Sequence, residues 1–591
     1  MNRIDVPVLI VGGGGAGLTA SMLLSQLGVE TLLVSALPTT SVLPKAHVLN
    51  QRAMEILTDA GVAGEIYRRG TPPEQMRYSA YYVGLAGPDP AYGRQLGRME
   101  SWGAGGLDLD WAAASACRQT NLPQIRLEPI LRRRAEALAP ERVRFHTELV
   151  DIEQDADGVT VVVRDKTAGT DTLVRARYVL ACDGGRTVGR KLGVEMQGPR
   201  DVMRIVSVYM SADLSRWARD PDVLIRWLWV PSRGSLAILV PMGPDHWGPE
   251  SEEWVFHLNY ETDDTRAIDD AQVVADMKEA LGLPDLDARV HVVSRWSLEG
   301  ILADRFQVGR VFLVGDAAHR HPPTGGLGLN SAIHDAHNLC WKIAAVLHGE
   351  AGESLLTTYE AERRPVDARN VERAMENGMN HALVGEAIGL QRGVAGDGNL
   401  DRLRRALGDA PEDVEHRRRA LTAMATQSME FREHQVEYGQ PYASTAVVCD
   451  GTPAATPLDD IRLYRPSTRP GAPLPHAEVE DLDGERLPLM SLVRPGEFLL
   501  IAGEDGEAWC AAAADLARSD GYPIRGIRIG HLDGDFRDPR CTWLGRREIG
   551  LRGAVLVRPD RYVGWRSLDG SDDPARDLRD ALERILCREA A

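Results

Sequence analysis

The stretch VLIVGGGGAGLTASMLLSQLGVETLLVS, residues 8–35, decides the fold of this chain. It opens with a continuous apolar run, which is typical of a parallel strand covered on both faces. Glycines follow, and residues 18–27 then place apolar side chains at helical spacing before a second apolar run at 29–34. The order strand, glycine turn, helix, strand predicts a βαβ unit that binds a dinucleotide.

The glycine turn of this unit fits the pattern GxGxxG. In that pattern Gly12 permits the tight turn, Gly14 lets the backbone approach a pyrophosphate, and Gly17 lets helix and strand pack closely. The helix N-terminus adds free N–H groups and a partial positive charge. The residues expected to bind a diphosphate are Gly12, Gly14, Gly15, Ala16 and Gly17. The second strand ends in Ser35, where such units usually have an acid for a ribose hydroxyl, and a serine makes that hydrogen bond more weakly.

Two motifs further along the chain indicate FAD rather than NAD. RVFLVGD at 310–316 predicts a strand that ends in Gly-Asp, and the Asp316 carboxylate can accept hydrogen bonds from a ribityl chain. The loop HPPTGGLGLN at 321–330 is stiff and rich in small residues, which suits contact with a flat ring. The helix after it can stabilise negative charge on a reduced flavin. The alternative is a plain helix cap at Asn330.

The remaining segments predict further regions. Residues 205–260 are rich in β-branched and aromatic residues and predict a mostly antiparallel sheet, and 355–440 predict a long helical region. DGTPAATP and RPSTRPGAPLP, within 445–475, predict a linker. The expected domains are an FAD-binding domain at 1–182 and 275–395, a substrate-binding domain at 183–274 with part of 75–125, a helical segment and linker at 396–475, and an α/β C-terminal domain at 476–591.

Composition and charge exclude several classes of partner. The formal net charge of −18 argues against nucleic acid and anionic membrane surfaces, which need a basic face. The seven cysteines lie far apart without a CxxC pair, so we expect no metal site and no disulfide framework. No stretch has the roughly 18 apolar residues of a membrane span, and the first residues lack the pattern of a signal peptide. These features predict a reduced, cytoplasmic protein.

The motifs, taken in order, resemble those of a known family. The GxGxxG turn, the Asp183-Gly184 turn in YVLACDGGRTVGR and the Gly315-Asp316 motif have the order and spacing of the single-component, or group A, flavoprotein aromatic hydroxylases. KAHVLNQRAMEIL (45–57), LPQIRLEPIL (122–131) and GDAAHRHPPTGGLGLNSAIHDAHNLCWKIA (315–344) are most similar to the branch that contains phenol hydroxylase and 2,4-dichlorophenol 6-monooxygenase.

This resemblance implies an α/β fold with three parts. These are an FAD-binding Rossmann-like domain of the p-hydroxybenzoate hydroxylase type, a mostly antiparallel substrate-binding sheet and a C-terminal thioredoxin-like domain. It also implies FAD as cofactor, NAD(P)H as co-substrate without a Rossmann domain of its own, and hydroxylation of an aromatic small molecule with O2 through a flavin C4a-hydroperoxide. A homodimer is a further expectation from the family. The C-terminal domain has no CxxC, so we expect a structural role without dithiol chemistry.

The resemblance also implies roles for individual residues. FAD contacts are implied at Lys45, Ala46, Arg52, Gln124 and, together with a role toward NAD(P)H, at Asp183. Contacts with the flavin ring are implied at Pro323, Gly326, Leu327, Gly328, Leu329 and Asn330. Lys45 stands where the family has an arginine, and a lysine keeps the charge without the bidentate fork. His47 stands where phenol hydroxylases have an aspartate that touches the substrate hydroxyl. A histidine there either accepts the phenol proton near neutral pH or only packs near the flavin.

For the middle sheet, the resemblance implies substrate contacts at two polar residues and a pocket wall made by three apolar ones. They are His257 and Asn259, and Trp227, Trp229 and Met242. The alternative for all five is ordinary sheet core.

Three other functions stay open from the sequence. WLWVP at 227–231 is one residue short of the halogenase motif WxWxIP, so a flavin-dependent halogenase is one of them. The second is an FAD-binding protein that only carries or senses a ligand. The third is the same hydroxylation on another ring: His47 in place of the aspartate, together with His257 and Asn259, indicates a hydroxypyridine or an aromatic polyketide rather than simple phenol.

Overall fold

The apolar run at the start of the chain forms β1 (Asn2–Val11), a central strand of a largely parallel sheet. β1 pairs in parallel with β2 (Thr31–Val34) and with β10 (Thr170–Ala181), and β10 pairs in parallel with β19 (Val311–Leu313). The sheet is completed by β7 (Val143–Arg144), β18 (Gln307–Val308) and the hairpin of β8 (Thr147–Gln154) and β9 (Val159–Asp165). The computed structural model describes residues 2–260, 269–393, 396–452 and 460–588.

Three helices pack together beside this sheet. α1 (Gly15–Gln26) contacts both α5 (Gln124–Leu138) and α8 (Leu327–Leu347). Most side chains of α1 and α8 are buried, as expected for helices whose apolar residues are not confined to one face. The shorter elements of this half of the chain are α2 (Gln51–Asp59), α3 (Ala63–Arg69), α4 (Leu109–Ala114), α6 (Val188–Lys191), β3 (Val48–Leu49), β6 (Thr120–Asn121), β11 (Met196–Gln197), β17 (Ile301–Ala303) and β20 (His319–Arg320).

The parallel arrangement brings three distant motifs to one edge of the sheet. Gly12 follows β1, Asp183 comes two residues after β10, and Gly315 comes two residues after β19. Because the carboxyl ends of neighbouring parallel strands lie together, these turns meet in space although they are far apart in the sequence. This edge is where ligands bind in open α/β sheets.

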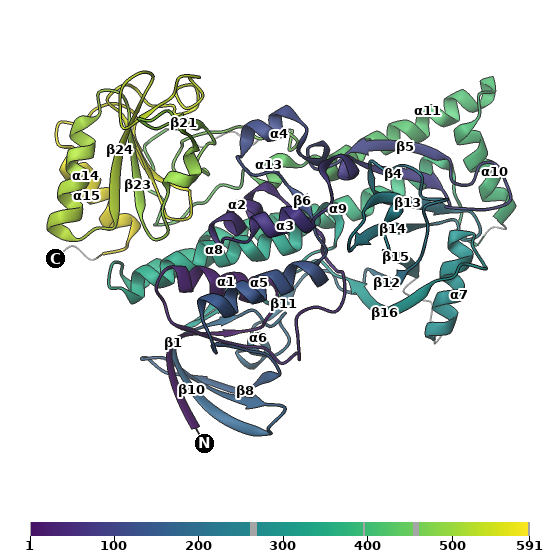
Figure 1. The fold of residues 1–591 in the computed structure, drawn as a ribbon, viewed down its shortest axis with the longest axis horizontal. Coiled ribbons are helices and arrows are strands. Elements are labelled where there is room, and N and C mark those ends of the chain that lie inside the picture. The colour runs from purple at the N-terminus through teal and green to yellow at the C-terminus, as the bar shows by residue number, and fades with distance from the viewer. Residues whose placement is uncertain (1, 261–268, 394–395, 453–459, 589–591) are drawn as a thin grey trace.

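A second, seven-stranded sheet lies beside the first (Figure 1). Its order is β16 (Arg289–Leu298), β12 (Met203–Ser211), β15 (Glu253–Tyr260), β14 (Ser235–Gly243), β13 (Val223–Val230), β4 (Tyr78–Val83) and β5 (Gln95–Glu100). All neighbouring strands are antiparallel except β13 and β4, which confirms the expected mostly antiparallel sheet. Trp254, Phe256 and Leu258 pack on one face against α7 (Asp270–Leu281). Successive side chains of a strand point to opposite faces, so residues 255, 257 and 259 point to the other face.

This sheet extends further along the chain than expected. The FAD-binding domain is expected to include 275–395, but β16 pairs with β12, and the buried side chains of α7 pack on the second sheet. The chain rejoins the first sheet only at β18. The boundary at 275 is therefore too early, because the pairing of β16 with a distant strand leaves no local signal in the sequence.

Helices fill the predicted region 355–440. α9 (Thr358–Ile388) packs on α8 and also reaches the second sheet, where a Cβ at Gly385 would lie 2.8 Å from the Trp229 ring. It is followed by α10 (Gly396–Leu407), α11 (Pro411–Thr426), α12 (Ser428–Phe431) and α13 (His434–Glu437). Residues 453–459 of the expected linker lie outside the described residues. Among the helices of the described ranges, none combines the length and apolar character needed to cross a bilayer.

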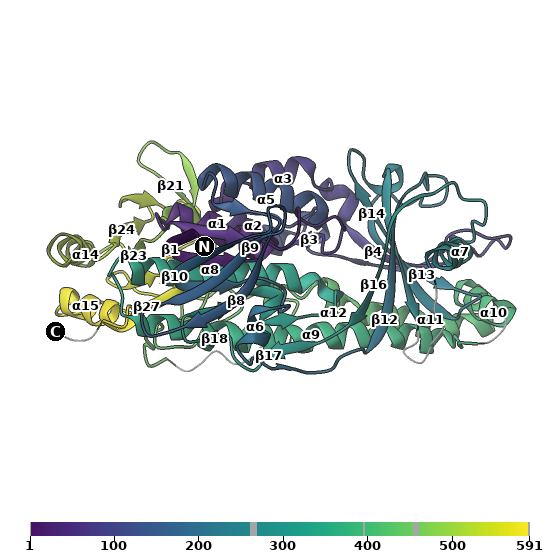
Figure 2. The same ribbon diagram turned by 90° about the horizontal axis from the view of Figure 1, so that it is seen from below.

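The C-terminal region forms a third sheet, at the opposite end of the molecule from the antiparallel one (Figures 1 and 2). β23 (Phe498–Ala502) and β24 (Ile524–Gly530) are parallel and are joined by α14 (Glu507–Asp520). β26 (Ala554–Val557) and β27 (Val563–Ser567) form an antiparallel hairpin, followed by α15 (Pro574–Ile585). A βαβ unit followed by a hairpin and a helix is the expected thioredoxin-like arrangement. The small strands β21 (Glu478–Glu480), β22 (Arg486–Pro488) and β25 (Phe536–Arg537) extend the sheet.

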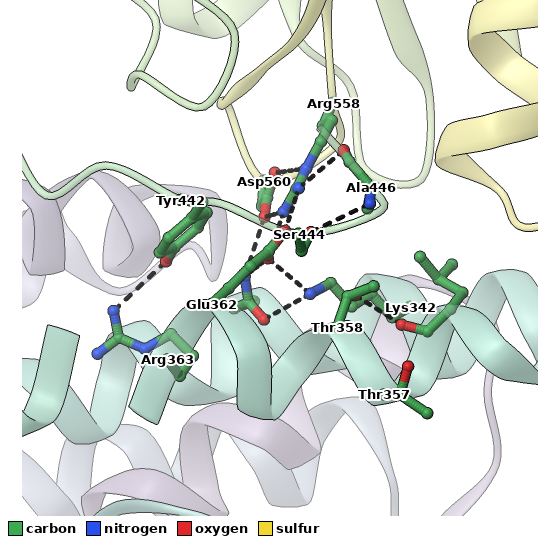
Figure 3. Close-up of polar contacts among 12 residues, drawn as sticks. Lys342, Thr357, Thr358, Glu362, Arg363, Tyr442, Ser444, Ala446, Arg558 and Asp560 are labelled. Carbon is green, nitrogen blue, oxygen red and sulfur yellow. Dashed lines mark hydrogen bonds and ion pairs between the residues drawn. The ribbon is translucent and has the colours of Figure 1, made fainter. Parts of the chain in front are cut away.

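A buried network of charges joins the C-terminal domain to the FAD-binding part (Figure 3). Arg558, just after β26, donates to both carboxylate oxygens of Glu362 on α9, at 2.6 and 2.9 Å. Glu362 also accepts from Nζ of Lys342 on α8 at 2.7 Å, and Arg558 pairs with Asp560. Burial opposes the ionisation of Glu362, but Arg558 and Lys342 outweigh it and lower the pKa of this carboxyl. Two cations thus balance two anions between the domains.

Candidate active site

A cavity of about 1690 Å³ lies between the parallel and the antiparallel sheet. The glycine turn, Ser35, Asp183 and Asp316 line it from the first sheet, and residues of β12 to β16 line it from the second. A pocket for one small ligand has about 300–1,000 Å³. This cavity therefore has room for a dinucleotide and a second molecule.

The glycine turn of the first sheet is shaped for a diphosphate. Gly12 has φ +124°, and a Cβ there would lie 2.0 Å from the Cys182 carbonyl oxygen. A Cβ at Gly17 would lie 2.0 Å from the Gly12 carbonyl oxygen, so this glycine serves the packing of helix on strand and does not itself line the cavity. Gly14 begins α1 without a capping side chain, and the first turn of the helix has no acidic residue. A helix N-terminus in this state favours an anion.

Asp316 and Asp183 line the same cavity but differ in what they bind. The Asp316 side chain is exposed to the cavity, which suits a polyol ligand. The Asp183 carboxylate accepts the N–H groups of Gly185, Thr187 and Val188 at 3.1, 2.7 and 2.9 Å. Asp183 therefore shapes the turn that borders the cavity.

The loop before α8 and the first turn of this helix supply another wall, formed by Pro323 and Gly326 of the loop and by Gly328 and Leu329 of α8. α8 begins after Gly326, with no capping side chain, so the alternative of a helix cap at Asn330 is wrong. Asn330 lies inside the helix, and its amide donates to the carbonyl oxygens of Val48 and Gly326 at 3.1 and 2.7 Å. It holds the loop in place without lining the cavity. Three features together fit FAD: the N-terminus of α1 without a capping side chain, the exposed Asp316 carboxylate and this glycine-rich wall.

Besides Gly17 and Asn330, three further predicted residues do not line the cavity. Arg52 does not line the cavity, because its buried guanidinium pairs with Glu55 at 2.7 Å and lies over the Tyr438 ring. Leu327 belongs to a small apolar cluster away from the cavity. Met242 belongs to β14 of the second sheet and is fully buried in the core, next to a shift in strand register between Pro241 and Gly243. The other predicted FAD contacts that line the cavity are Gly15, Ala16, Ser35, Lys45, Ala46 and Gln124.

Glu128 also lines the cavity, and the sequence motifs did not assign it a role. It lies one helical turn after Gln124, which donates to it at 2.5 Å, and it also accepts the backbone N–H of Ser41 at 2.6 Å. Burial raises the pKa of Glu128. A carboxyl that resists ionisation is compatible with a neighbouring diphosphate. The i, i+4 spacing of Gln124 and Glu128 is the feature of the sequence from which their contact could be predicted.

The cavity face of the second sheet follows from strand alternation. Lining side chains recur at every second position on four neighbouring strands: Ile205, Ser207 and Tyr209; Val255, His257 and Asn259; Leu236, Ile238 and Val240; Ile225, Trp227 and Trp229. Four of the five predicted substrate residues belong to this face. Most of the face is apolar, so its few polar atoms decide how a ligand is oriented.

His47 presents one ring nitrogen to the cavity and uses the other to hold its position. Its Nδ1 lies 2.6 Å from Oδ1 of the buried Asn121, whose amide nitrogen donates to Thr71 at 2.7 Å. Because that amide oxygen is an acceptor, Nδ1 carries the hydrogen and Nε2 is left with a lone pair. Burial lowers the pKa of His47, and the Asn121 contact offsets part of the shift. Thr71 and Asn121 were not found from the sequence.

His257 is held on the opposite wall. Its Nδ1 lies 2.7 Å from the Ser207 hydroxyl on the neighbouring strand, which accepts the indole N–H of Trp296 at 2.9 Å. Burial lowers the pKa of His257 to about 4, and the nearby His47 adds to the shift. Both histidines are therefore neutral near pH 7.

A third histidine connects the two walls. The His381 ring from α9 stacks on Trp227 with centroids 4.0 Å apart. Its Nδ1 contacts the Tyr81 hydroxyl at 2.6 Å, and its Nε2 contacts Glu430 at 2.7 Å. Glu430 also accepts the backbone N–H of Gly325, in the loop before α8, at 3.2 Å. This series of contacts links the substrate wall to the loop before α8. It could not be predicted from the sequence, because Tyr81, His381 and Glu430 belong to separate elements.

His319, His321 and Asp367 form the one group of metal-ligand type found among the described residues. His319 contacts Asp335 at 2.8 Å, and Arg363 binds both Asp335 and Asp367. His319 and Asp367 thus belong to a buried network of opposite charges with Asp335 and Arg363, and we assign these two a structural role. His321 lines the cavity, and its ring nitrogens have no hydrogen-bond partner among the described residues.

Comparison with known proteins agrees with this geometry. A family described as "FAD binding domain" matches residues 5–374, and one described as "Aromatic-ring hydroxylase, C-terminal" matches 467–588. The chain is 35% identical to 2,4-dichlorophenol 6-monooxygenase of Delftia acidovorans, over 99% of this chain and 98% of that protein. It is 34% identical to tetracenomycin B2 monooxygenase-dioxygenase of Streptomyces olivaceus, over 100% of both. The solved structure of the flavin-dependent monooxygenase PieE with FAD and substrate matches with a TM-score of 0.92, at 36% identity over 100% of both chains.

The fold and the cavity define a flavoprotein hydroxylase, and the chain belongs to the FAD-dependent aromatic-ring hydroxylases. It is an FAD-dependent aromatic monooxygenase with NAD(P)H as co-substrate. The similarities lie with monooxygenases, so the halogenase and the non-catalytic FAD-binding protein are not supported.

Proposed function

We propose that this monooxygenase hydroxylates a ring that already carries a hydroxyl group, and that His47 accepts the proton of that hydroxyl. The observation that supports this proposal is the contact of Nδ1 with Asn121, because it leaves the Nε2 lone pair of a cavity-lining imidazole available. Removing the proton increases electron density at the ring carbons ortho and para to the oxygen. FAD, when bound and reduced by NAD(P)H, activates O2 for transfer of one oxygen atom to such a carbon.

The lining of the cavity favours a ligand larger than phenol. The substrate face extends over four strands and includes the rings of Trp227 and Trp229. A relative acts on tetracenomycin B2, as its name states. A fused aromatic or a hydroxypyridine with an apolar substituent therefore fits better than a single unsubstituted phenol.

Cellular location and assembly belong to the same proposal. The seven cysteines lie apart in the sequence, and the co-substrate is an intracellular reductant, so we expect a cytoplasmic enzyme. We expect a homodimer, as in the family. Cell fractionation and light scattering would test the two expectations, and a secreted protein or a monomer would contradict them.

The base role is tested with purified holoenzyme. NAD(P)H oxidation in air and product mass are followed for 1-naphthol and for naphthalene, which lacks the hydroxyl. We expect 1-naphthol to gain one oxygen atom. His47→Asn should lower kcat/KM by about 100-fold or more, the usual contribution of a general base. The matched control is His348→Asn, which changes an exposed histidine at the end of α8 and should leave kcat/KM unchanged. Equal rates for His47→Asn and the unaltered enzyme would reject the base role.

A further inference from the structure

We propose that His257 donates a hydrogen bond from Nε2 to the substrate, so that the preferred ring carries an acceptor, a carbonyl oxygen or a ring nitrogen, in addition to its hydroxyl group. This inference rests on the proposed function and specifies its substrate class. It concerns the face of the cavity formed by β12, β15 and β16.

The hydrogen atom on His257 is placed by a count of donors. Ser207 and His257 are directly opposite each other on β12 and β15, and their side chains are 2.7 Å apart. The Trp296 indole only donates, so the Ser207 oxygen is the acceptor of that 2.9 Å contact. The single hydrogen of the Ser207 hydroxyl is then directed to Nδ1 of His257. A neutral imidazole that accepts at Nδ1 carries its hydrogen on Nε2.

The reverse arrangement would be costly. If Nδ1 of His257 carried the hydrogen, Ser207 would accept two hydrogen bonds, and its own hydrogen would have no acceptor among the described residues. Ser207 is only 9% exposed, so that hydrogen would have little access to water. A buried unpaired donor is unfavourable.

The two histidines therefore offer opposite chemistry to the cavity. His47 donates a hydrogen bond from Nδ1 to Asn121 and presents an acceptor to the cavity. His257 accepts a hydrogen bond at Nδ1 from Ser207 and presents a donor. Both residues line the cavity, and neither Nε2 atom has a hydrogen-bond partner among the described residues. Neither Nε2 atom is among the fully buried polar atoms of the described residues. The low pKa of His257 keeps it a neutral donor over the physiological range.

A ligand that satisfies both atoms must combine a hydroxyl with an acceptor. Hydroxyaryl ketones, hydroxyquinones and hydroxypyridines have this combination, whereas phenol and alkylphenols leave the His257 N–H unpaired. Leaving a buried donor unpaired weakens binding by about tenfold or more.

The position of the hydrogen is read directly by nitrogen NMR. Holoenzyme is prepared with histidine labelled with nitrogen-15 in the ring, and His257→Asn and His47→Asn identify the two sets of signals by their loss. We expect the His257 spectrum to show a protonated Nε2 and an unprotonated Nδ1 at pH 7, and the His47 spectrum to show the reverse. A His257 that is protonated at Nδ1, or at both nitrogens, overturns the inference.

The substrate class is tested by binding to the oxidised holoenzyme, followed by the flavin absorbance change. The probes are 6-hydroxy-1-tetralone and 5,6,7,8-tetrahydro-2-naphthol, which share a skeleton and a hydroxyl and differ by the carbonyl. We expect the ketone to bind about tenfold more tightly. Ser207→Ala should bring the ratio of the two Kd values close to one, because Nδ1 then has no donor that fixes the tautomer. Ser207→Thr retains the hydroxyl and should retain the ratio.

A matched control is available on the same strand. Ser211 contacts His291 at 2.7 Å, and neither lines the cavity, so Ser211→Ala should leave the ratio unchanged. A ratio near one in the unaltered enzyme, or an unchanged ratio in Ser207→Ala, overturns the substrate class. Failure of the proposed function is separate: it would appear as loss of oxygen transfer to hydroxylated rings, whereas the NMR and binding ratios do not require turnover.

Discussion

At the scale of single residues, the reactive side chains are set by their partners. His47 is a neutral acceptor because its Nδ1–H donates a hydrogen bond to Asn121, and Asn121 is itself held by a hydrogen bond to Thr71. The family resemblance pointed to position 47, and the histidine suggested a base, but the residues that choose its tautomer lie at positions 71 and 121 and have no local signal. For Arg52 the family resemblance implied an FAD contact. In the structure its buried guanidinium pairs with Glu55 and does not line the cavity.

The pH dependence of activity should report on His47. Burial lowers its pKa below the ordinary value of about 6.5, so the base is neutral at pH 7, and kcat/KM falls only as pH drops through this lowered pKa. Asn121→Asp places a negative charge beside Nδ1 and should move the acid limb to higher pH, because an opposite charge favours the imidazolium. The pH profiles of kcat/KM for the two proteins measure the shift. An acid limb that stays in place would show that another group is titrating.

Asp316 should contribute to FAD affinity through its exposed carboxylate. A hydrogen bond to a charged group contributes about 1.5–3 kcal/mol, which corresponds to a tenfold to hundredfold change in Kd. We expect Asp316→Asn to raise the Kd of FAD by that factor in fluorescence titrations of apoenzyme. Asp157→Asn, in the exposed turn between β8 and β9, is the matched control. Equal FAD affinity of both variants would remove Asp316 from the site.

At the scale of elements, the local patterns predicted most strands and helices, and long-range pairing decided the rest. β23 and β24 belong to the α/β C-terminal domain expected at 476–591, and turn residues flank the apolar runs that form them. Alternation along β13 and β15 brought Trp227, Trp229, His257 and Asn259 to the cavity. It did not reveal Ser207 or His381, because which strand or helix lies opposite is set by topology. The same cause placed β16 in the second sheet and beyond the expected boundary.

The link between elements through Glu430 should affect how well oxygen transfer is coupled to NAD(P)H use. Glu430 binds both His381 on the substrate wall and the backbone of Gly325 in the flavin loop. Glu430→Gln keeps the shape but removes the charge and replaces one acceptor oxygen with a donor, so the contacts with His381 and Gly325 cannot both keep their present donor and acceptor roles. We expect a larger share of oxidised NAD(P)H to yield hydrogen peroxide. Glu415→Gln, on the exposed side of α11, is the control, and unchanged coupling in Glu430→Gln would argue against a link.

At the scale of the whole molecule, the cavity lies between two sheets and the C-terminal domain is docked from the far side. α8 and α9 connect these parts, since α8 begins at the flavin loop and both helices contribute to the network with Arg558 (Figure 3). The sequence indicated a separate C-terminal domain, but not the buried charges that hold it, because Lys342, Glu362 and Arg558 are ordinary charged residues in the sequence.

Removing Arg558 should destabilise the docked molecule. Arg558→Leu leaves Glu362 and Asp560 buried without their main partner, and breaking a buried pair in this way costs about 3–5 kcal/mol. We expect a lower urea midpoint. Arg579→Leu breaks a partly exposed pair with Asp520 in the same domain and should cost less than about 1 kcal/mol. Similar midpoints for the two variants would show that the network does not hold the domain.

The central claim, that this chain transfers one oxygen atom from O2 to a hydroxylated aromatic ring, is tested most directly with isotopic oxygen. The holoenzyme is supplied with NAD(P)H, 6-hydroxy-1-tetralone and O2 labelled with oxygen-18, and the product is analysed by mass spectrometry. The account predicts a product that has gained one labelled oxygen atom on the ring, at a rate that falls with His47→Asn. NAD(P)H oxidation that yields only hydrogen peroxide, or a product whose added oxygen comes from water, would contradict it.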